Sequence, residues 1–284
     1  IMDNIVFLNG KFIDKSEASI SIMDRGFLFG DGVYELIPVY KSRIFLLDKH
    51  LARLKSSLNH INIDSESVDI NNLGEVINGI IEKNKILDSF IYVHITRGPQ
   101  SPRNHVYQSN LKPTILVMGE NYNIFSKDQI MRGFQATVQT DFRWTKSHIK
   151  SISLLGNVLL KNHANDNNFY ETLLIRDDLL TEGAASNVFI VEGGNVITPK
   201  LSENLLPGVT RDLIINLARQ SDKQVFEEDI SSDRLISADE IWCSSSTNYV
   251  VPITKVDDVI IQNGKVGDTT KEFYNLVTKF IQEL

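Results

Sequence analysis

Cysteine is nearly absent from this sequence, which has a single thiol, Cys243, among 284 residues. One cysteine excludes an intrachain disulfide framework and a cysteine-rich zinc site. Long apolar runs are also missing, so no segment approaches the length of a membrane-spanning helix. Residues 1–4 show neither the basic region nor the apolar region of a secretory signal peptide. These absences suit a reducing cytosol, and we expect a cytoplasmic protein without a membrane partner.

Positive charge is also in deficit. The chain carries 29 lysines and arginines against 36 aspartates and glutamates, a formal net charge of -7. Non-specific nucleic-acid binding needs a basic surface, so no nucleic-acid partner is expected. The His, Cys, Asp and Glu spacing suggests no metal site, and neither a G-x-S-x-G elbow nor a G-x-x-x-x-G-K-[ST] loop occurs. With 42% hydrophobic residues, the chain is long enough for one large domain or two smaller ones.

The first 119 residues predict a small α+β domain, because short β-type runs alternate with two helical periods. Asn9-Gly10 is a strong signal for a two-residue hairpin turn. Asp48 is expected to cap a helix whose apolar stripe runs from Leu51 to Ile61. The expected elements are a hairpin over 4–14, strands over 33–40 and 43–47, the helix from Asp48, a helix over 71–85, and strands over 90–96 and 114–118.

A polar stretch without clear periodicity, Gly-Glu-Asn-Tyr-Asn, occupies residues 119–123. We predict a linker over 120–123 and a larger second domain over 124–284. The elements expected in that domain are strands over 134–140, 171–176, 187–192, 224–227, 240–244 and 251–260, and helices over 154–165, from 210 onward, and over 270–284.

One lysine of the second half, Lys150, has the surroundings of a reactive amine. A lysine forms a Schiff base effectively only if it is held against a carbonyl and partly deprotonated by its environment. Ile149, Ile152 and Leu154 flank Lys150, which suits removal of the amine from water. An arbitrary lysine is a surface residue. The nearby competitor, Lys146, lacks the apolar run on its C-terminal side.

Glu182 is a candidate partner for a cofactor ring. A carboxylate beside a pyridine nitrogen keeps that nitrogen protonated, because the ion pair favours the charged form. A protonated ring withdraws electrons more strongly from a neighbouring carbanion. Glu182 stands in Thr-Glu-Gly just before an expected strand, so the alternative is an ordinary turn glutamate, and local sequence leaves both interpretations open. Asn187 is expected to fix the turn.

A phosphate-type loop is predicted at Leu206–Thr210. It ends where a helix is expected to begin, so free N–H groups and the positive end of the helix dipole converge there. Gly208 allows close backbone approach. Arg53 and the hydroxyl-rich turn at 245–247 could add donors. Each feature has an ordinary alternative, because Thr210 could be an N-cap and Arg53 a solvated helix residue.

Two further stretches could bind a substrate. The first, 24–35, contains turn glycines and Tyr34, which is either a strand residue or a phenol donor. The second, 96–105, carries Arg103 and His105 two residues apart in a proline-punctuated loop. These two side chains could hold a carboxylate together. A mobile basic loop is the alternative, and local sequence favours it slightly.

Together these segments resemble one family across nearly the whole chain, the class IV aminotransferases, which are the fold-type IV pyridoxal-phosphate enzymes. The lysine and glutamate segments are specific to class IV, and the Arg-x-His motif resembles the D-amino acid (D-alanine) aminotransferase branch. The resemblance implies a small N-terminal α+β domain, a larger β-barrel-like domain with helices, and a cofactor between them. The runs that carry it are 24–35, 101–105, 149–156, 181–189 and 208–212.

The resemblance also implies a role for each matching residue. Lys150 would form a Schiff base with pyridoxal 5′-phosphate, and Glu182 would pair with its ring nitrogen. Tyr34, Arg103 and His105 would bind the substrate α-carboxylate. In this family the Arg-x-His loop reaches the active site of the neighbouring subunit, so a homodimer is implied. The phosphate and the ring face would be contacted by Arg53, Val209, Thr210 and Ser246, and by Leu206, respectively.

The implied activity is transamination of D-amino acids of the D-alanine or D-glutamate type with a 2-oxo acid acceptor. The alternatives on the same fold are a branched-chain L-amino acid aminotransferase, against which the Arg-Asn-His run argues, and 4-amino-4-deoxychorismate lyase. A non-catalytic carrier of the cofactor would lose Lys150 or Glu182, and both are present. Pro38, Ala184 and Ala185 replace a basic residue and two serines of the family pattern, which bears on substrate breadth and rate.

Overall fold

The computed structural model describes residues 4–121, 124–221 and 223–284. The chain divides into two compact units, the first made of Ile1–Tyr122 with Ile149–Leu154 and the second of Asn123–His148 with Leu155–Leu284. The segment that contains Lys150 therefore belongs to the first unit, although it lies far along the chain. Within the predicted linker, Glu120 ends a strand, and Tyr122 and Asn123 lie outside the described residues.

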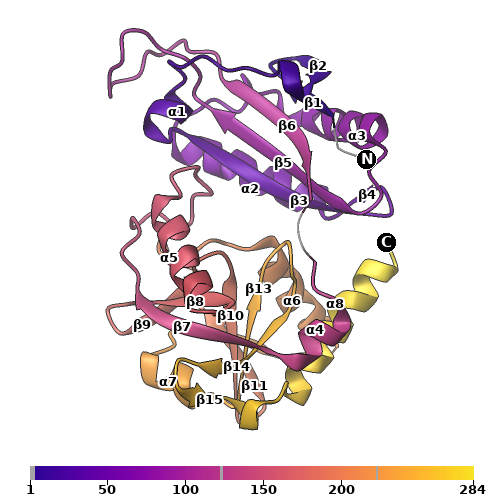
Figure 1. Cartoon of the computed structure of the whole chain (residues 1–284), viewed down its shortest axis with the longest axis vertical. Coiled ribbons are helices and arrows are strands. Elements are labelled where there is room, and N and C mark those ends of the chain that lie inside the picture. Colours follow the sequence, from indigo (N-terminus) through magenta and orange to yellow (C-terminus); the bar gives the residue numbers. More distant parts are fainter. Residues whose placement is uncertain (1–3, 122–123, 222) are drawn as a thin grey trace. The chain divides into compact units, whose positions relative to one another are not determined.

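The first unit is built on a six-stranded antiparallel sheet in the order β2-β1-β6-β5-β3-β4 (Figure 1). The predicted hairpin is confirmed, and both turn residues, Asn9 and Gly10, have the positive φ that a two-residue turn of this kind requires. β4 is shorter than predicted, because the next helix begins at Leu47. The strands are β1 Ile5–Leu8, β2 Lys11–Asp14, β3 Gly32–Tyr40, β4 Arg43–Ile44, β5 Ser89–Thr96 and β6 Thr114–Glu120.

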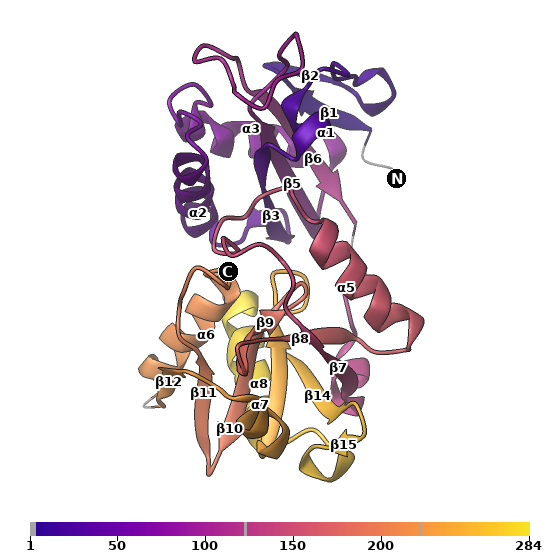
Figure 2. The same cartoon turned by 90° about the vertical axis from the view of Figure 1, so that its left-hand side faces the viewer.

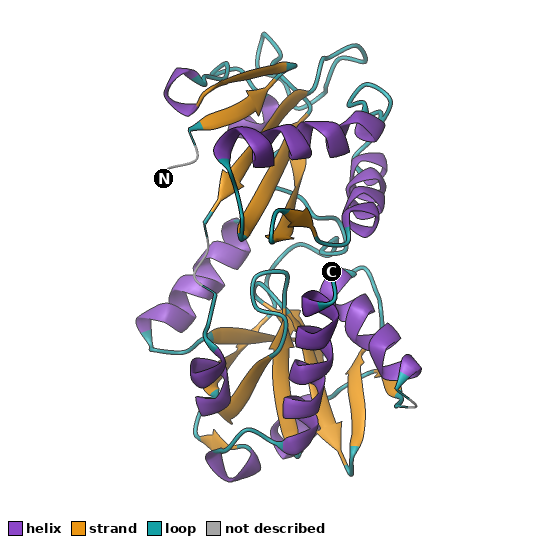
Figure 3. Cartoon of the chain, turned by 90° about the vertical axis from the view of Figure 1, so that its right-hand side faces the viewer, coloured by secondary structure: helices purple, strands orange, loops and turns teal. Residues whose placement is uncertain are grey.

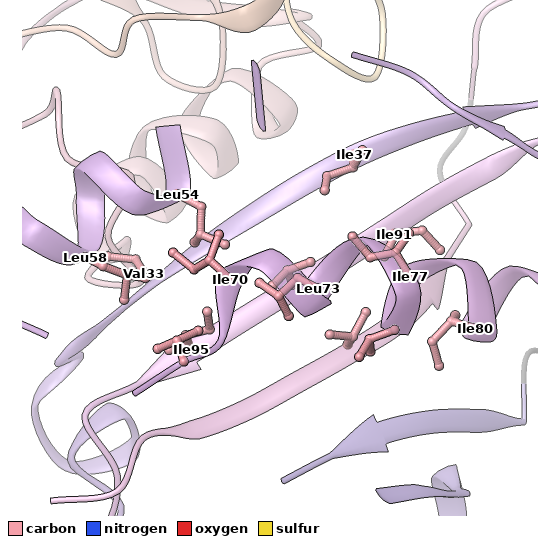
Figure 4. Close-up of a cluster of buried hydrophobic side chains, with 14 of the residues drawn as sticks. Val33, Ile37, Leu54, Leu58, Ile70, Leu73, Ile77, Ile80, Ile91 and Ile95 are labelled. Atoms are coloured by element: carbon pink, nitrogen blue, oxygen red, sulfur yellow. The ribbon is translucent and has the colours of Figure 1, made fainter. Parts of the chain in front are cut away.

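Helices α2 and α3 pack against this sheet and bury a continuous apolar cluster (Figure 4). Leu54 and Leu58 of α2 meet Val33 and Ile37 of β3 in the cluster. The predicted cap at Asp48 is wrong. The N-cap is Leu46, and Asp48 lies in the first turn, where its charge complements the helix dipole. The helical segments of this unit are α1 Arg25–Phe29, α2 Leu47–His60 and α3 Leu73–Asn84, with 3-10 turns at Lys15–Glu17 and Ile70–Asn72.

The second unit contains a nine-stranded mixed sheet in the order β12-β11-β10-β13-β14-β7-β8-β9, with β15 paired to β14. β9 also contacts β10 and β11, so the sheet curls back toward its other end (Figure 2). The predicted strand over 251–260 is two strands joined by a turn at Asp257. The strands are β7 Phe134–Thr140, β8 Glu171–Arg176, β9 Leu179–Gly183, β10 Asn187–Glu192, β11 Asn195–Pro199, β12 Val225–Glu228, β13 Glu240–Ser244, β14 Val251–Val256 and β15 Val259–Ile260.

Helices α6 and α8 lie against each other and against this sheet (Figure 3), whereas α5 packs on β7 and β8. The core includes a stack of three rings, in which Trp242 lies between Phe189 and Phe273 at centroid distances of 5.1 and 5.4 Å. None of the helices in the described ranges is both long and apolar enough to cross a membrane. The helices are α4 Lys127–Arg132, α5 Leu155–Asp166, α6 Val209–Gln220, α7 Ser232–Ser237 and α8 Asp268–Gln282, with a 3-10 turn at Gln262–Gly264.

Candidate active site

Lys150 lies in an extended segment that runs beside β3 in the first unit. Its carbonyl accepts the Tyr34 N–H at 3.0 Å, and its own N–H donates to Ser57 Oγ at 3.2 Å. The Lys150 Nζ lies 4.2 Å from the centroid of the Tyr34 ring. No ion pair to this Nζ is found within the described ranges. The structure therefore brings two of the predicted residues together, and it leaves the lysine amine half-buried and without a carboxylate partner.

Glu35 follows Tyr34 on β3, and its carboxylate contacts α2. The sequence reasoning did not single out this residue. The fully buried Glu35 carboxylate accepts hydrogen bonds from Arg53 Nε at 2.7 Å and Arg53 Nη2 at 2.8 Å, and it contacts His50 Nδ1 at 2.8 Å. Burial raises the pKa of Glu35, but Arg53 and His50 outweigh it and hold this pKa well below its usual range. Arg53 is thus fixed by a buried carboxylate and is not a solvated helix residue.

His50 is the second residue of this group that sequence reasoning missed. Burial lowers the pKa of its imidazole despite the nearby Glu35, so the ring is neutral at pH 7. Its Nε2 is buried and has no hydrogen-bond partner in the part of the chain that the structure describes. Buried polar nitrogens are nearly always paired. Because the Nδ1–H faces the Glu35 carboxylate, Nε2 of the neutral ring is an acceptor, and the partner that fits it is a donor such as a water molecule or a hydroxyl group.

Glu182 lies on β9 in the second unit, inside a strand rather than in the turn predicted as the alternative. One carboxylate oxygen accepts the Arg143 Nη1–H at 2.8 Å. The other accepts the Leu206 N–H at 3.0 Å and the Asn187 side-chain amide at 3.4 Å. Burial raises the pKa of Glu182, and Arg143 and the Leu206 N–H offset this only in part. The structure therefore brings Glu182 and Leu206 together.

Arg143 is held in place by a second carboxylate. Asp141 accepts its Nε–H at 2.9 Å and its Nη2–H at 3.0 Å, and it also bonds Thr181 at 2.9 Å and pairs with Arg176. Burial raises the pKa of Asp141, but Arg143 outweighs it and the resulting pKa lies below the usual value. An Asp-x-Arg sequence directly after β7 was the signal available for this pair. Arg143 is therefore a cation held in one orientation against the Glu182 carboxylate.

The predicted phosphate-type loop forms the start of α6 in the second unit. Gly208 is the N-cap and Val209 the first helical residue, so Thr210 is not the cap. The Thr210 hydroxyl instead donates to the Ser245 carbonyl at 3.2 Å, which ties the loop to the hydroxyl-rich turn at 245–247. Ser246 is half-buried in that turn. The first N–H groups of α6 and the adjacent hydroxyls form a donor set suited to an anion.

Asn187 explains why residue 208 is a glycine. A Cβ on Gly208 would lie 2.0 Å from the Asn187 Oδ1. The Asn187 amide donates to the Leu206 carbonyl at 2.9 Å and reaches Glu182 at 3.4 Å. The close approach predicted at Gly208 is therefore to a side chain of this protein. That side chain links the loop to Glu182. Nearby, the buried Ser244 Oγ has no partner within the described ranges, and an anion at this turn would supply one.

Arg103 and His105 lie on an exposed loop of the first unit, where both flank Phe29. The Arg103 guanidinium is 4.4 Å from the Phe29 ring centroid, and the His105 ring is 5.1 Å from it. Neither makes a contact with Tyr34 or Lys150 in the described chain. The structure thus brings Arg103 and His105 together but keeps them apart from the other predicted carboxylate-binding residue.

The three departures from the family pattern have different environments. Pro38 is buried in β3 opposite Phe90. Ala184 is buried in a small apolar cluster with Leu160 and Leu174. Ala185 is exposed, and its N–H donates to Glu171 at 3.3 Å.

Comparisons with known proteins agree with the predicted family. The sequence model of the family Amino-transferase class IV matches residues 32–256. The chain is 36% identical over 278 residues to a D-alanine aminotransferase of Staphylococcus epidermidis, with 98% of each chain covered. It is 35% identical over 266 residues to a D-alanine aminotransferase of Bacillus licheniformis, covering 94% of this chain and 93% of that one.

Among solved structures, the fold matches a branched-chain amino acid aminotransferase of Escherichia coli with a TM-score of 0.90. That match covers 98% of this chain and 94% of the other at 23% identity. The predicted fold, with a small α+β part and a larger part built on a curled sheet, is confirmed by this likeness. With the family match over 32–256 and the full-length relatives, the chain belongs to the class IV aminotransferases.

Proposed function

We propose that this protein catalyses transamination of D-amino acids, of the D-alanine or D-glutamate type, with a 2-oxo acid as acceptor. One observation carries the chemistry: the Lys150 amine lies against the Tyr34 ring and has no carboxylate partner in the described ranges. Such an amine is available to bond a carbonyl and to exchange protons. The choice of D-amino acids is supported by full-length relatives named D-alanine aminotransferase and by the Arg103-Asn104-His105 run.

The cofactor is pyridoxal 5′-phosphate, which class IV aminotransferases use and which, when bound, withdraws electrons from the substrate carbon that loses its hydrogen. Lys150 would hold it covalently, Glu182 would face its ring nitrogen and Leu206 would lie against its ring. The donor set at the start of α6 fits the phosphate, since the nearby Ser244 Oγ is a buried hydroxyl without a partner in the described chain. The residues proposed to bind that phosphate are Arg53, Val209, Thr210 and Ser246.

The chain's own groups then have separate tasks. Lys150 Nζ would remove the proton from the substrate Cα and, once protonated, act as the acid of the same exchange, so it serves one face of the substrate. Glu182 presents an acceptor whose charge is supported by Arg143 at 2.8 Å. Glu35 keeps Arg53 in one orientation through two hydrogen bonds, which lowers the conformational cost of binding an anion there.

The substrate α-carboxylate is proposed to bind Tyr34, Arg103 and His105. In one chain, Arg103 and His105 flank Phe29 and do not contact Tyr34. We therefore assign them to the active site of a second copy, which makes the enzyme a homodimer. An exposed apolar stripe on α5, formed by Leu155, Val158 and Leu159 at 73%, 49% and 54% exposure, supports association, because such patches are typical of protein interfaces. The cytoplasmic location stays a prediction.

A substrate panel tests this function. Purified holoenzyme is supplied with the D- and L-forms of alanine and glutamate, or with L-leucine, together with 2-oxoglutarate or pyruvate, and products are resolved by chiral chromatography. Pyruvate from D-alanine, and none from L-alanine, is the expected result. Turnover of L-leucine would favour the branched-chain alternative. Pyruvate from 4-amino-4-deoxychorismate without an acceptor would favour the lyase. Borohydride reduction followed by peptide mapping should place the cofactor on Lys150 and not on Lys146.

A further inference from the structure

The loop that carries Arg103 and His105 is exposed, yet its backbone is held by a buried arginine. Arg25, at the start of α1, is 4% exposed. Its Nη1 donates to the Asn104 carbonyl at 2.6 Å and its Nη2 to the His105 carbonyl at 3.0 Å. One guanidinium therefore fixes two consecutive peptide groups, and these directly follow Arg103.

Arg25 is itself anchored to the body of the first unit through Asp31. Arg25 Nε donates to Asp31 Oδ2 at 2.7 Å, and Arg97 donates to the same carboxylate through Nε at 2.8 Å and Nη2 at 2.9 Å. Arg97 also donates to the carbonyls of Ile61 and Asn62 just after α2. Burial raises the pKa of Asp31, but Arg97 and Arg25 outweigh it and the pKa lies below its ordinary value. The carboxylate is thus charged at neutral pH.

Aromatic rings complete the contact between this anchor and the loop. The Phe29 ring lies 4.9 Å from the Arg25 guanidinium carbon and 4.4 Å from that of Arg103. The Tyr107 ring, further along the loop, lies 3.9 Å from the guanidinium carbon of Arg97. Cation–π contacts of this length are attractive. The cluster of Arg25, Asp31 and Arg97 therefore holds both the backbone and the side chains of the loop.

We infer that Arg25 is a positioning residue for substrate binding, which sets the place of Arg103 and His105 through their backbone. The inference rests on the proposed carboxylate-binding role of these two residues. A loop that is already fixed before substrate arrives loses less conformational entropy on binding. Arg25 acts through the loop and does not itself touch the substrate. Asp31 and Arg97 hold Arg25 in the orientation that reaches both carbonyls.

The test compares Arg25→Gln with Arg43→Gln, a change of an exposed arginine in the same unit. Arg25→Gln should raise KM for D-alanine about tenfold and change kcat by no more than about twofold. Hydrogen exchange at residues 101–108 should become faster, while exchange in α3 stays as in the wild type. Arg43→Gln should leave all three quantities unchanged. Arg25→Lys keeps the positive charge but lacks the planar guanidinium that reaches both carbonyls, so its KM should lie between those of the wild type and Arg25→Gln.

A combined variant separates positioning from general stability. If Arg25 acts through Arg103 and His105, adding Arg25→Gln to a variant that carries both Arg103→Ala and His105→Ala should raise KM by less than about twofold. Unchanged exchange at 101–108 in Arg25→Gln would overturn the inference, and so would faster exchange with an unchanged KM. A wild-type enzyme that does not turn over any D-amino acid would instead overturn the proposed function, and the exchange experiment would still report whether Arg25 holds the loop.

Discussion

At the scale of single residues, Glu182 is a carboxyl on which burial and a neighbouring cation act in opposite directions. Burial raises its pKa, and Arg143 opposes that rise. Arg143→Met should therefore raise the pKa of Glu182 further and favour its neutral form, which does not support a positive ring nitrogen. We expect kcat for D-alanine to fall roughly tenfold or more.

The measurement is kcat at saturating D-alanine, with cofactor content checked by absorbance and folding by thermal melting. Arg234→Met, which removes a partly exposed arginine paired with Glu192 in the same unit, is the matched control and should keep kcat. A fully loaded Arg143→Met enzyme with wild-type kcat would contradict this role for Arg143.

His50 gives stability a defined pH dependence. Burial lowers the pKa of its imidazole in the folded protein, whereas an unfolded histidine titrates near about 6.5. As pH falls below that value, the unfolded chain takes up a proton that the folded chain does not, so the free energy of unfolding decreases. The pKa of Glu35 is lowered as well, and the stabilisation that it contributes is lost in a more acidic range, progressively as pH falls from the usual pKa of a glutamate toward the lower pKa of the folded state.

Urea unfolding at about pH 7.5 and pH 5.5 would measure this loss of stability. The two pH values lie about one unit to each side of the pKa of an unfolded histidine. The wild type should lose stability over this interval, and His50→Gln should lose less of it. His60→Gln, at the exposed end of α2, should behave as the wild type. Equal losses in all three proteins would exclude His50 as the source.

At the scale of elements, the approach of α6 to β10 depends on the small size of Gly208. An alanine there would place its Cβ 2.0 Å from Asn187 Oδ1. Asn187 bonds the Leu206 carbonyl and reaches Glu182, so the clash would displace the loop and the start of the helix. We expect Gly208→Ala to weaken cofactor binding by roughly tenfold or more, measured by spectroscopic titration of the apoenzyme.

Gly74→Ala is the matched control for this change. Gly74 lies in the first turn of α3, where an added Cβ would meet its nearest neighbour, Leu47, at 3.4 Å. An alanine in a helix is favoured over glycine by about 0.5–1 kcal/mol, so this variant should bind cofactor normally and melt at the same or a higher temperature. Normal cofactor affinity in Gly208→Ala would show that the loop tolerates the shift.

Local signals predicted the elements that carry a clear period. Strands β7, β8, β10 and β13 begin and end where expected, because each is a compact apolar or alternating run between polar turns. β9 and β11 were missed, since both are short and each follows a tight turn, at Asp177-Asp178 and Gly193-Gly194. β9 contains Glu182, and because this strand was missed, the sequence left a turn position open for that residue.

The site was predictable where residues act through a local motif and not where they act through long-range pairing. Lys150 and Glu182 are flagged by their own neighbours in the sequence. Glu35, His50 and Arg143 are not, because their significance comes from partners on other elements, such as the bonds from α2 to β3. Nor does chain order indicate that Lys150 packs with the first unit.

At the scale of the whole molecule, the proposed dimer makes a prediction that no single-chain site can satisfy. Lys150→Ala and Arg103→Ala should each have little activity when assayed alone, the second at low D-alanine concentration. If Arg103 serves the neighbouring subunit, a mixed dimer has one site with both defects and one with neither. Unfolding and refolding the two variants together in equal amounts should therefore restore about a quarter of the wild-type activity, since half of the dimers are mixed. Refolding each variant alone gives the baseline. If the mixture stays at that baseline while sedimentation shows dimers, Arg103 acts within its own chain and the assignment of the loop to a second copy is wrong.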